Sequence, residues 1–145
     1  MIRHVWSVLC NNASVDIDSG SVSLFNLMEQ LTVFTHSTDE IILPIRFEIF
    51  SLWTYEEDDA TAQGEIQVTF CDPDQTCHKH AELDIDLTNA SFSRTRIRFE
   101  GLKIKGPGKY QFKVEFCPKG GSSFSPAAIL PLFIVYQSPP EEITE

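Results

Sequence analysis

The sequence LKIKGPGKYQFKV, at residues 102–114, contains the pattern that decides the fold. Apolar residues alternate with polar ones on both sides of a central Gly-Pro-Gly at residues 106–108. Alternation with a period of two is typical of a β-strand with one buried face, because successive side chains point to opposite faces. Glycine and proline between two such segments mark a tight turn. The stretch therefore predicts two strands joined by a short turn.

The same alternation extends over most of the chain and predicts an all-β protein. The expected strands lie near residues 3–9, 15–17, 22–24, 31–34, 45–55, 66–70, 83–87, 95–99, 110–116 and 128–136, with turn formers between them. In the segment 45–55 the phase slips near Phe50, since Phe47 and Ile49 share one face while Phe50 and Leu52 share the other. A β-bulge or burial on both faces would produce this slip. Pro131 indicates that the last strand lies at an edge or contains a bulge.

Length and composition favour one globular domain. The chain has 145 residues, of which 42% are hydrophobic, and its eleven Phe far outnumber its three Tyr and two Trp. Phenylalanine has no polar atom to satisfy, so this bias favours a dry core. We expect one domain over residues 1–137. Residues 138–145 form an acidic tail without apolar anchors, and we expect this tail to be disordered.

The charge balance restricts the partners. The formal net charge is −10 with only eleven Lys and Arg, which disfavours nucleic acid and anionic membrane surfaces. No segment has the roughly 18 consecutive apolar residues of a membrane span, and no convincing secretory signal is found. We therefore expect a cytoplasmic protein with reduced thiols.

The stretch at residues 102–114 resembles a strand–turn–strand element of immunoglobulin-like sandwiches, with the pattern L-x-I-x-x-P-G-x-Y-x-F-x-V. The resemblance implies that Gly108 makes the corner. It also implies that the Tyr110 hydroxyl bonds to the backbone near the turn.

The beginning of the chain resembles a family of small uncharacterised bacterial proteins, in which an L-C-[DN] strand precedes a short hairpin. The matching residues are Val8-Leu9-Cys10, Val15-Asp16 and Ser21 to Phe25. Together the two resemblances imply a bacterial, immunoglobulin-like fold with no known activity. We expect a two-sheet antiparallel β-sandwich of about eight strands with Greek-key connections.

Two cysteines and two histidines lie close together between residues 71 and 80. Cys71, Cys77, His78 and His80 are the candidate metal ligands, since all four residues are of types that bind zinc. Their spacing differs from that of zinc fingers, and the intervening Asp72-Pro73-Asp74 reads as a turn. A hairpin would place the cysteines opposite one another, where a disulfide forms only under oxidising conditions. We therefore expect no stoichiometric zinc and no cofactor.

Arg94, Arg96 and Arg98 share one face of an expected strand and are candidate ligands for an anion or an acidic partner. The preceding strand carries three acidic residues at the same spacing. Since the connection between the two strands is short, we expect an antiparallel hairpin with a cross-strand ladder of charges. The expected pairs are Asp86 with Arg94, Asp84 with Arg96 and Glu82 with Arg98.

The sequence contains no G-x-S-x-G, phosphate-binding glycine loop or H-E-x-x-H motif. The leading interpretation is a non-enzymatic protein-interaction or structural module with a protein partner or self-association, by analogy with other sandwiches. One alternative is a small hydrolase or metal-dependent enzyme using residues 71–80. Another is a carbohydrate- or ligand-binding module using exposed aromatic residues such as Trp53 and Tyr55.

Overall fold

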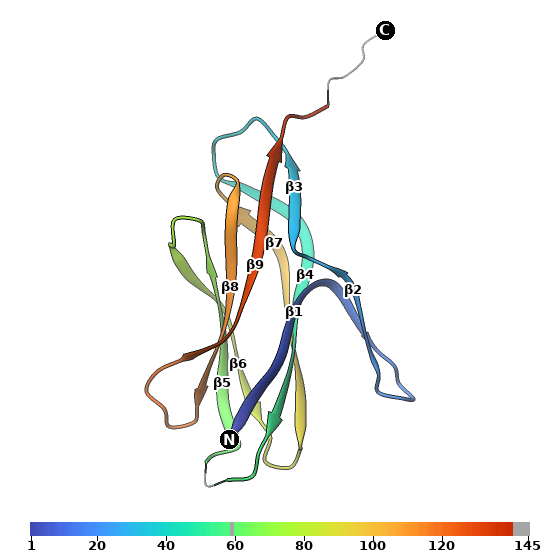
Figure 1. Cartoon of the computed structure of the whole chain (residues 1–145), viewed down its shortest axis with the longest axis vertical. Helices are drawn as coiled ribbons and strands as arrows, with labels where there is room; N and C mark the ends of the chain where they lie inside the picture. Colours follow the sequence, from blue (N-terminus) through green and yellow to red (C-terminus); the bar gives the residue numbers. More distant parts are fainter. Residues whose placement is uncertain (59, 141–145) are drawn as a thin grey trace.

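The computed structural model describes residues 1–58 and 60–140, which form nine β-strands and no helix (Figure 1). The strands are β1 (Ile2–Val15), β2 (Val22–Leu27), β3 (Gln30–Phe34), β4 (Ile41–Tyr55), β5 (Gln63–Cys71), β6 (Cys77–Asp86), β7 (Phe92–Ile104), β8 (Gly108–Pro118) and β9 (Ser125–Gln137). The all-β prediction is therefore confirmed. No helix that is long and apolar enough to cross a membrane occurs in this part of the chain. Most of the acidic tail, residues 141–145, lies outside the described residues.

The strands form two sheets. The first has the order β2-β1-β4-β7 and is antiparallel throughout, and the second has the order β3-β9-β8-β5-β6. The second sheet is mixed, because β3 runs parallel to β9. The expectation of purely antiparallel sheets is wrong at this pair. A parallel pair needs a long connection, and here most of the chain separates the two strands, so local alternation could not reveal their pairing.

Phenylalanine rings from the two sheets meet in the core. Phe47 of β4 lies 5.7 Å from Phe112 of β8, with an edge-to-face geometry that aromatic pairs favour. Phe47 also stacks on Phe99 within its own sheet. Trp53 approaches Phe116 across the same space. This packing accounts for part of the Phe-rich composition, since Phe25, Phe34, Phe92 and Phe133 remain about half exposed.

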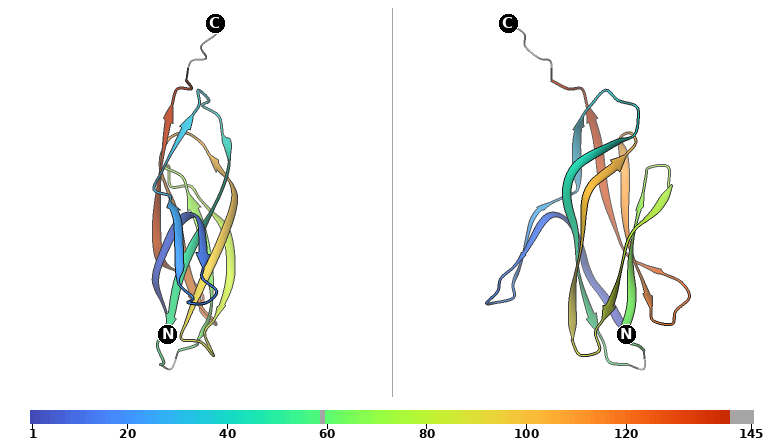
Figure 2. Two further views of the ribbon diagram at one scale, coloured as in Figure 1. Left: turned by 90° about the vertical axis from the view of Figure 1, so that its right-hand side faces the viewer. Right: turned by 180° about the vertical axis from the view of Figure 1, so that it is seen from behind.

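β4 is buried on both of its faces near its centre. Phe47 and Ile49 lie in the core between the sheets, whereas Phe50 packs on the opposite face with Cys10 and Ala13 of β1. The β1–β2 hairpin stands away from the other strands at its tip, as Figures 1 and 2 show, and its base covers Phe50. Burial on both faces therefore explains the phase slip seen in the sequence.

The turn between β7 and β8 has the geometry that the resemblance implied. Tyr110 is 1% exposed, and its hydroxyl donates to the Gly106 carbonyl at 2.8 Å and accepts from the Lys105 N–H at 3.0 Å. Gly108 has φ +141°, and a Cβ atom there would lie 2.7 Å from Cγ of Pro73 in the β5–β6 turn. The corner thus holds the β7–β8 turn and packs against the neighbouring hairpin.

We expect Tyr110→Phe to lower the free energy of unfolding by about 1 kcal/mol, because it removes a buried hydroxyl with backbone partners on both sides. Urea unfolding followed by tryptophan fluorescence measures this loss. Tyr55→Phe is the matched control, since the Tyr55 hydroxyl donates only to the exposed Ala60 carbonyl. Equal unfolding free energies for the two variants would contradict a special role for the corner.

Candidate functional site

The expected charge ladder between β6 and β7 is wrong. The two strands lie in different sheets, so the pairs of Asp86 with Arg94, Asp84 with Arg96 and Glu82 with Arg98 do not form. The chain crosses between the sheets after Leu87, which is 1% exposed and donates its N–H to the Ala62 carbonyl at 2.7 Å. A short connection allows either a hairpin or such a crossing, and alternation is the same in both. The acids of β6 instead lie opposite β5, where Asp84 faces Glu65.

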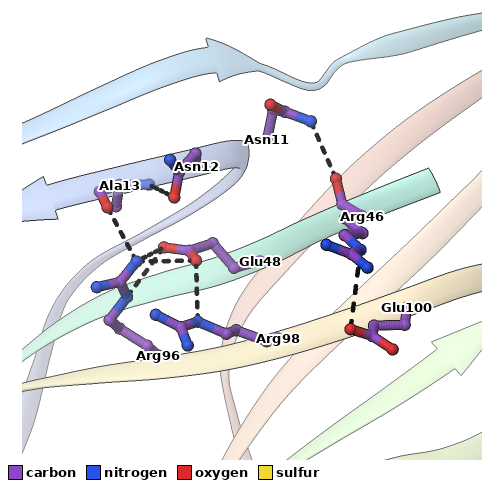
Figure 3. A network of polar contacts seen from close by, with 8 residues as sticks. All are labelled: Asn11, Asn12, Ala13, Arg46, Glu48, Arg96, Arg98 and Glu100. Atoms are coloured by element: carbon purple, nitrogen blue, oxygen red, sulfur yellow. Dashed lines mark hydrogen bonds and ion pairs between the residues drawn. The ribbon is translucent and has the colours of Figure 1, made fainter.

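The central arginine of the stripe binds a buried carboxylate of β4 (Figure 3). Arg96 donates from Nε to Oε1 of Glu48 at 3.1 Å and from Nη2 to Oε2 at 3.0 Å, while the Glu48 side chain is 4% exposed. Arg96 also donates from Nη2 to the Ala13 carbonyl of β1 at 2.9 Å. A buried carboxylate requires such charge-assisted partners. We call this set, Glu48, Arg96 and the Ala13 carbonyl, the arginine brace.

Of the other two arginines, Arg98 is exposed and Arg94 is partly buried. Nε of Arg98 lies 3.6 Å from Oε2 of Glu48, with 70% of the Arg98 side chain exposed. Arg94 lies over the ring of Phe92. Arg96 is therefore a structural residue, and an anion could reach only Arg94 and Arg98 of the predicted stripe.

Apolar side chains and a thiol lie beneath the brace. Cys10 is fully buried beside Phe50 and Ala13. Burial raises the pKa of the Cys10 thiol, and the nearby Glu48 carboxylate raises it further. The thiolate is the reactive form of cysteine. Cys10 is therefore an inert part of the packing.

The predicted metal ligands are arranged differently from a zinc site. Cys71 and Cys77 lie opposite one another at the end of the β5–β6 hairpin and form a disulfide, which differs from the reduced thiols that we expected. Sulfur atoms in a disulfide are not thiolate ligands. The His80 ring lies 4.5 Å from the Phe99 ring, where partial burial lowers the pKa of His80, and both His78 and His80 are exposed residues. In the described ranges, no three His, Cys, Asp or Glu side chains gather closely enough to hold a metal.

Trp53 is not the exposed aromatic residue that a sugar-binding surface requires. It is 1% exposed and donates from Nε1 to the Thr95 hydroxyl at 3.0 Å. Tyr55 is partly buried. The interpretation of these two residues as a ligand platform is therefore wrong for Trp53.

An apolar groove lies where the two sheets meet beside β1 and β9, and sequence reasoning missed it. Its volume is about 410 Å³. Leu27 and Phe133 on its walls are 56% and 45% exposed, although they are large apolar residues. The apolar lining consists of Val8, Leu9, Leu27, Met28, Leu130, Pro131 and Phe133, together with Ser7 and Glu29.

Ser7 connects the groove to a small polar cluster. Its hydroxyl lies 2.7 Å from Nε2 of His4 and 2.6 Å from the hydroxyl of Ser51 on β4. The His4 ring packs edge-on against Trp53, and burial lowers the pKa of His4, which favours the neutral imidazole. These contacts hold β1 to β4 and satisfy the polar atoms below the groove.

Two features of the sequence lie at this groove. The segment around Trp6 and Val8 is apolar on both faces, and Pro131 indicated an edge strand or a bulge. Neither signal could show that β1 and β9 lie beside one another. That proximity depends on how the two sheets pack.

We expect Arg96→Met to lower the free energy of unfolding by about 3 kcal/mol, because it leaves the buried Glu48 carboxylate without its main partner. Arg94→Met is the comparison, because the Arg94 guanidinium lies over the half-exposed Phe92 ring, and it should change this free energy by less than about 0.5 kcal/mol. Replacing Glu48 and Arg96 together by Met should recover most of the loss, since a buried ion pair can be exchanged for apolar side chains. Urea unfolding of the four proteins measures these differences. An Arg96→Met protein as stable as the parent would show that the brace is dispensable.

Thiol titration tests the disulfide. With its bond intact, the denatured protein should expose the two thiols of Cys10 and Cys117, and reduction should expose four. Reduction should lower the free energy of unfolding by about 2 kcal/mol, given the short loop that the bond closes. Cys77→Ser should lose this sensitivity to reductant. Four thiols before reduction would contradict the bond.

Comparison with known proteins gives no information about the function. The sequence matches no protein-family model, and no curated protein is similar to it. The family resemblance of its two ends thus stays an expectation, and the groove and the arginine brace are the two features from which a function can be argued.

Proposed function

We propose that this chain is a non-enzymatic protein-interaction module built on an immunoglobulin-like β-sandwich with Greek-key connections. The contact between the apolar faces of the two sheets and the tyrosine corner at Tyr110 support this architecture. The non-sequential strand order of both sheets also supports it. A sandwich is a scaffold for many functions, so the function rests on the surface.

The exposed apolar groove carries the proposal. Leu27 and Phe133 leave about half of their area in solvent at one place, next to Met28 and Leu130. Isolated surface apolar residues need no explanation, but a hollow lined by them is typical of an interaction site. Among the residues that the structure describes, Glu29 is the one charged residue that lines it.

The alternatives receive less support. A metal-dependent enzyme at residues 71–80 would need the thiolates of Cys71 and Cys77, and these atoms are joined to one another. A carbohydrate platform would need an exposed Trp53, which is buried. An anion site on the arginine stripe would lack its central residue, because Arg96 already binds Glu48.

The proposed partner is a protein rather than nucleic acid or a membrane, because the net charge of −10 repels polyanions. We also propose a bacterial origin, which rests on the resemblance of the two ends, and a cytoplasmic location. The buried free thiols of Cys10 and Cys117 agree with that location. The Cys71–Cys77 disulfide argues against it, because disulfides are typical of oxidising compartments.

Affinity capture tests the role of the groove. The immobilised chain should retain partners that a Leu27→Lys/Phe133→Lys variant loses, because the added charges cannot be buried against an apolar partner. Ile42→Lys is the control, since Ile42 is 72% exposed on β4 and does not line the groove. Quantitative mass spectrometry measures the retained proteins. Identical sets for the groove variant and the control would refute the proposal.

A further inference from the structure

We propose that the groove receives an extended, basic segment of a partner protein, which pairs with the free edge of β1 as an added strand. This inference rests on the proposed function and specifies its partner. It follows from the pairing of β1, from the lack of protection along its edge, and from the chemistry of the groove.

The first half of β1 has a partner on one side only. β1 pairs with β4 from Ile2 to Cys10, but with β2 only from Cys10 to Val15. Before Cys10, therefore, no strand of residues 1–58 and 60–140 pairs with its other edge. The strand curves away from the body at this point, and it carries β2 with it (Figure 1).

The backbone groups of Ser7 point toward this free edge. The carbonyl of Leu9 accepts the Met28 N–H at 2.8 Å, so Leu9 faces away from β4. In an antiparallel ladder, successive residues alternate between their two neighbours. Ser7, two residues earlier, therefore presents its N–H and C=O on the same side, next to the groove that Ser7 lines.

Some edges of the fold carry residues that normally prevent pairing, whereas the short edge strands β2 and β3 contain neither proline nor a charged residue. β9 has Pro126 and Pro131, and β6 has a row of charged side chains. β1 has neither between His4 and Leu9. Two features still limit pairing: β9 lies close to β1 beside the groove, and the bulge at Val5 restricts a regular ladder to about four residues. So short a ladder needs side-chain anchors as well.

The groove supplies these anchors. Alternate side chains of an added strand point to the same face, where Val8, Leu27 and Phe133 line the hollow. Backbone pairing with pockets for alternate side chains is the recognition mode of strand addition. The occupant should therefore carry apolar residues at every second position.

Charge selects a basic segment. Glu29 lies at the groove, and no cation of the described residues forms a salt bridge with it. The formal net charge of the whole chain is −10. A segment with Lys or Arg beside its apolar residues is complementary to both, whereas a second copy would bring the same negative charge and its own Glu29.

Fluorescence anisotropy with synthetic peptides tests the inference on the full chain. The probe is fluorescein-labelled KVTVTVK. Its controls are EVTVTVE, which reverses the charge, and KVTVTVK methylated on alternate backbone nitrogens, which keeps the side chains and removes donors. We expect saturable binding of the probe and at least about tenfold weaker binding of both controls, equivalent to about 1.4 kcal/mol.

Paired variants of the protein locate the binding. Ser7→Pro removes the outward N–H without touching the β4 ladder, whereas Ser7→Ala loses the same hydroxyl bonds to His4 and Ser51 but keeps the N–H. Ser7→Pro should therefore bind the peptide about tenfold or more weakly than Ser7→Ala. Glu29→Lys should weaken the binding of KVTVTVK and strengthen the binding of EVTVTVE. Melting curves verify folding, and the methylated peptide gives the same information if Ser7→Pro does not fold.

Three results would overturn the inference. The first is no saturable binding of KVTVTVK up to about 1 mM. The second is equal affinity for all three peptides. The third is a dimer in sedimentation velocity that Ser7→Pro abolishes, which would make a second copy the occupant. If affinity capture depends on Leu27 and Phe133 but no peptide binds, the interaction function stands and strand addition fails.

Discussion

A buried carboxylate on the outer face of a sheet must be neutralised, and this constraint organises one side of the molecule. Glu48 of β4 is held by two nitrogen atoms of Arg96, whose guanidinium also reaches the Ala13 carbonyl. The brace thereby joins β7, β4 and the bent part of β1. Because such a pair is costly to break once desolvated, it holds the base of the β1–β2 hairpin over Phe50.

The position of the β1–β2 hairpin determines which part of the β1 edge remains unpaired. β1 separates from β4 after Cys10, and β2 pairs with the second half of β1 and not with the first. The chain then crosses to the other sheet, where Phe133 donates its N–H to the Glu29 carbonyl. The apolar groove lies beside this crossing. The same bend that buries Phe50 thus exposes Leu27 and frees the edge of β1.

The two ends of the molecule differ in how firmly the backbone is fixed. At the β7–β8 corner, the Tyr110 hydroxyl and the close approach of Gly108 to Pro73 fix the turn. Below the groove, the Ser7, Ser51 and His4 side chains join β1 to β4 from one side. An added strand on the other side would meet an edge already held in the extended conformation. A preorganised edge lowers the entropy cost of binding.

The sequence by itself determined the local structure. Alternation predicted the strands, and the slip at Phe50 predicted either a bulge or burial on both faces, of which the structure shows the burial. The bonds of Tyr110 were implied by the resemblance of residues 102–114 to an immunoglobulin-like element. These features follow from backbone geometry and from neighbours close in the chain. Opposed cysteines across a turn were also foreseen, although their oxidation was not.

Only the tertiary structure decided which strands lie beside one another. The alternating acids and arginines predicted a ladder between β6 and β7, yet the chain crosses between sheets at Leu87, and Arg96 finds Glu48 instead. The sequence likewise did not predict the parallel pairing of β3 with β9 or the groove between β1 and β9. A period of two specifies which side chains share a face, but it is the same in every sheet. The choice of neighbour depends on how the apolar faces of the whole chain pack together.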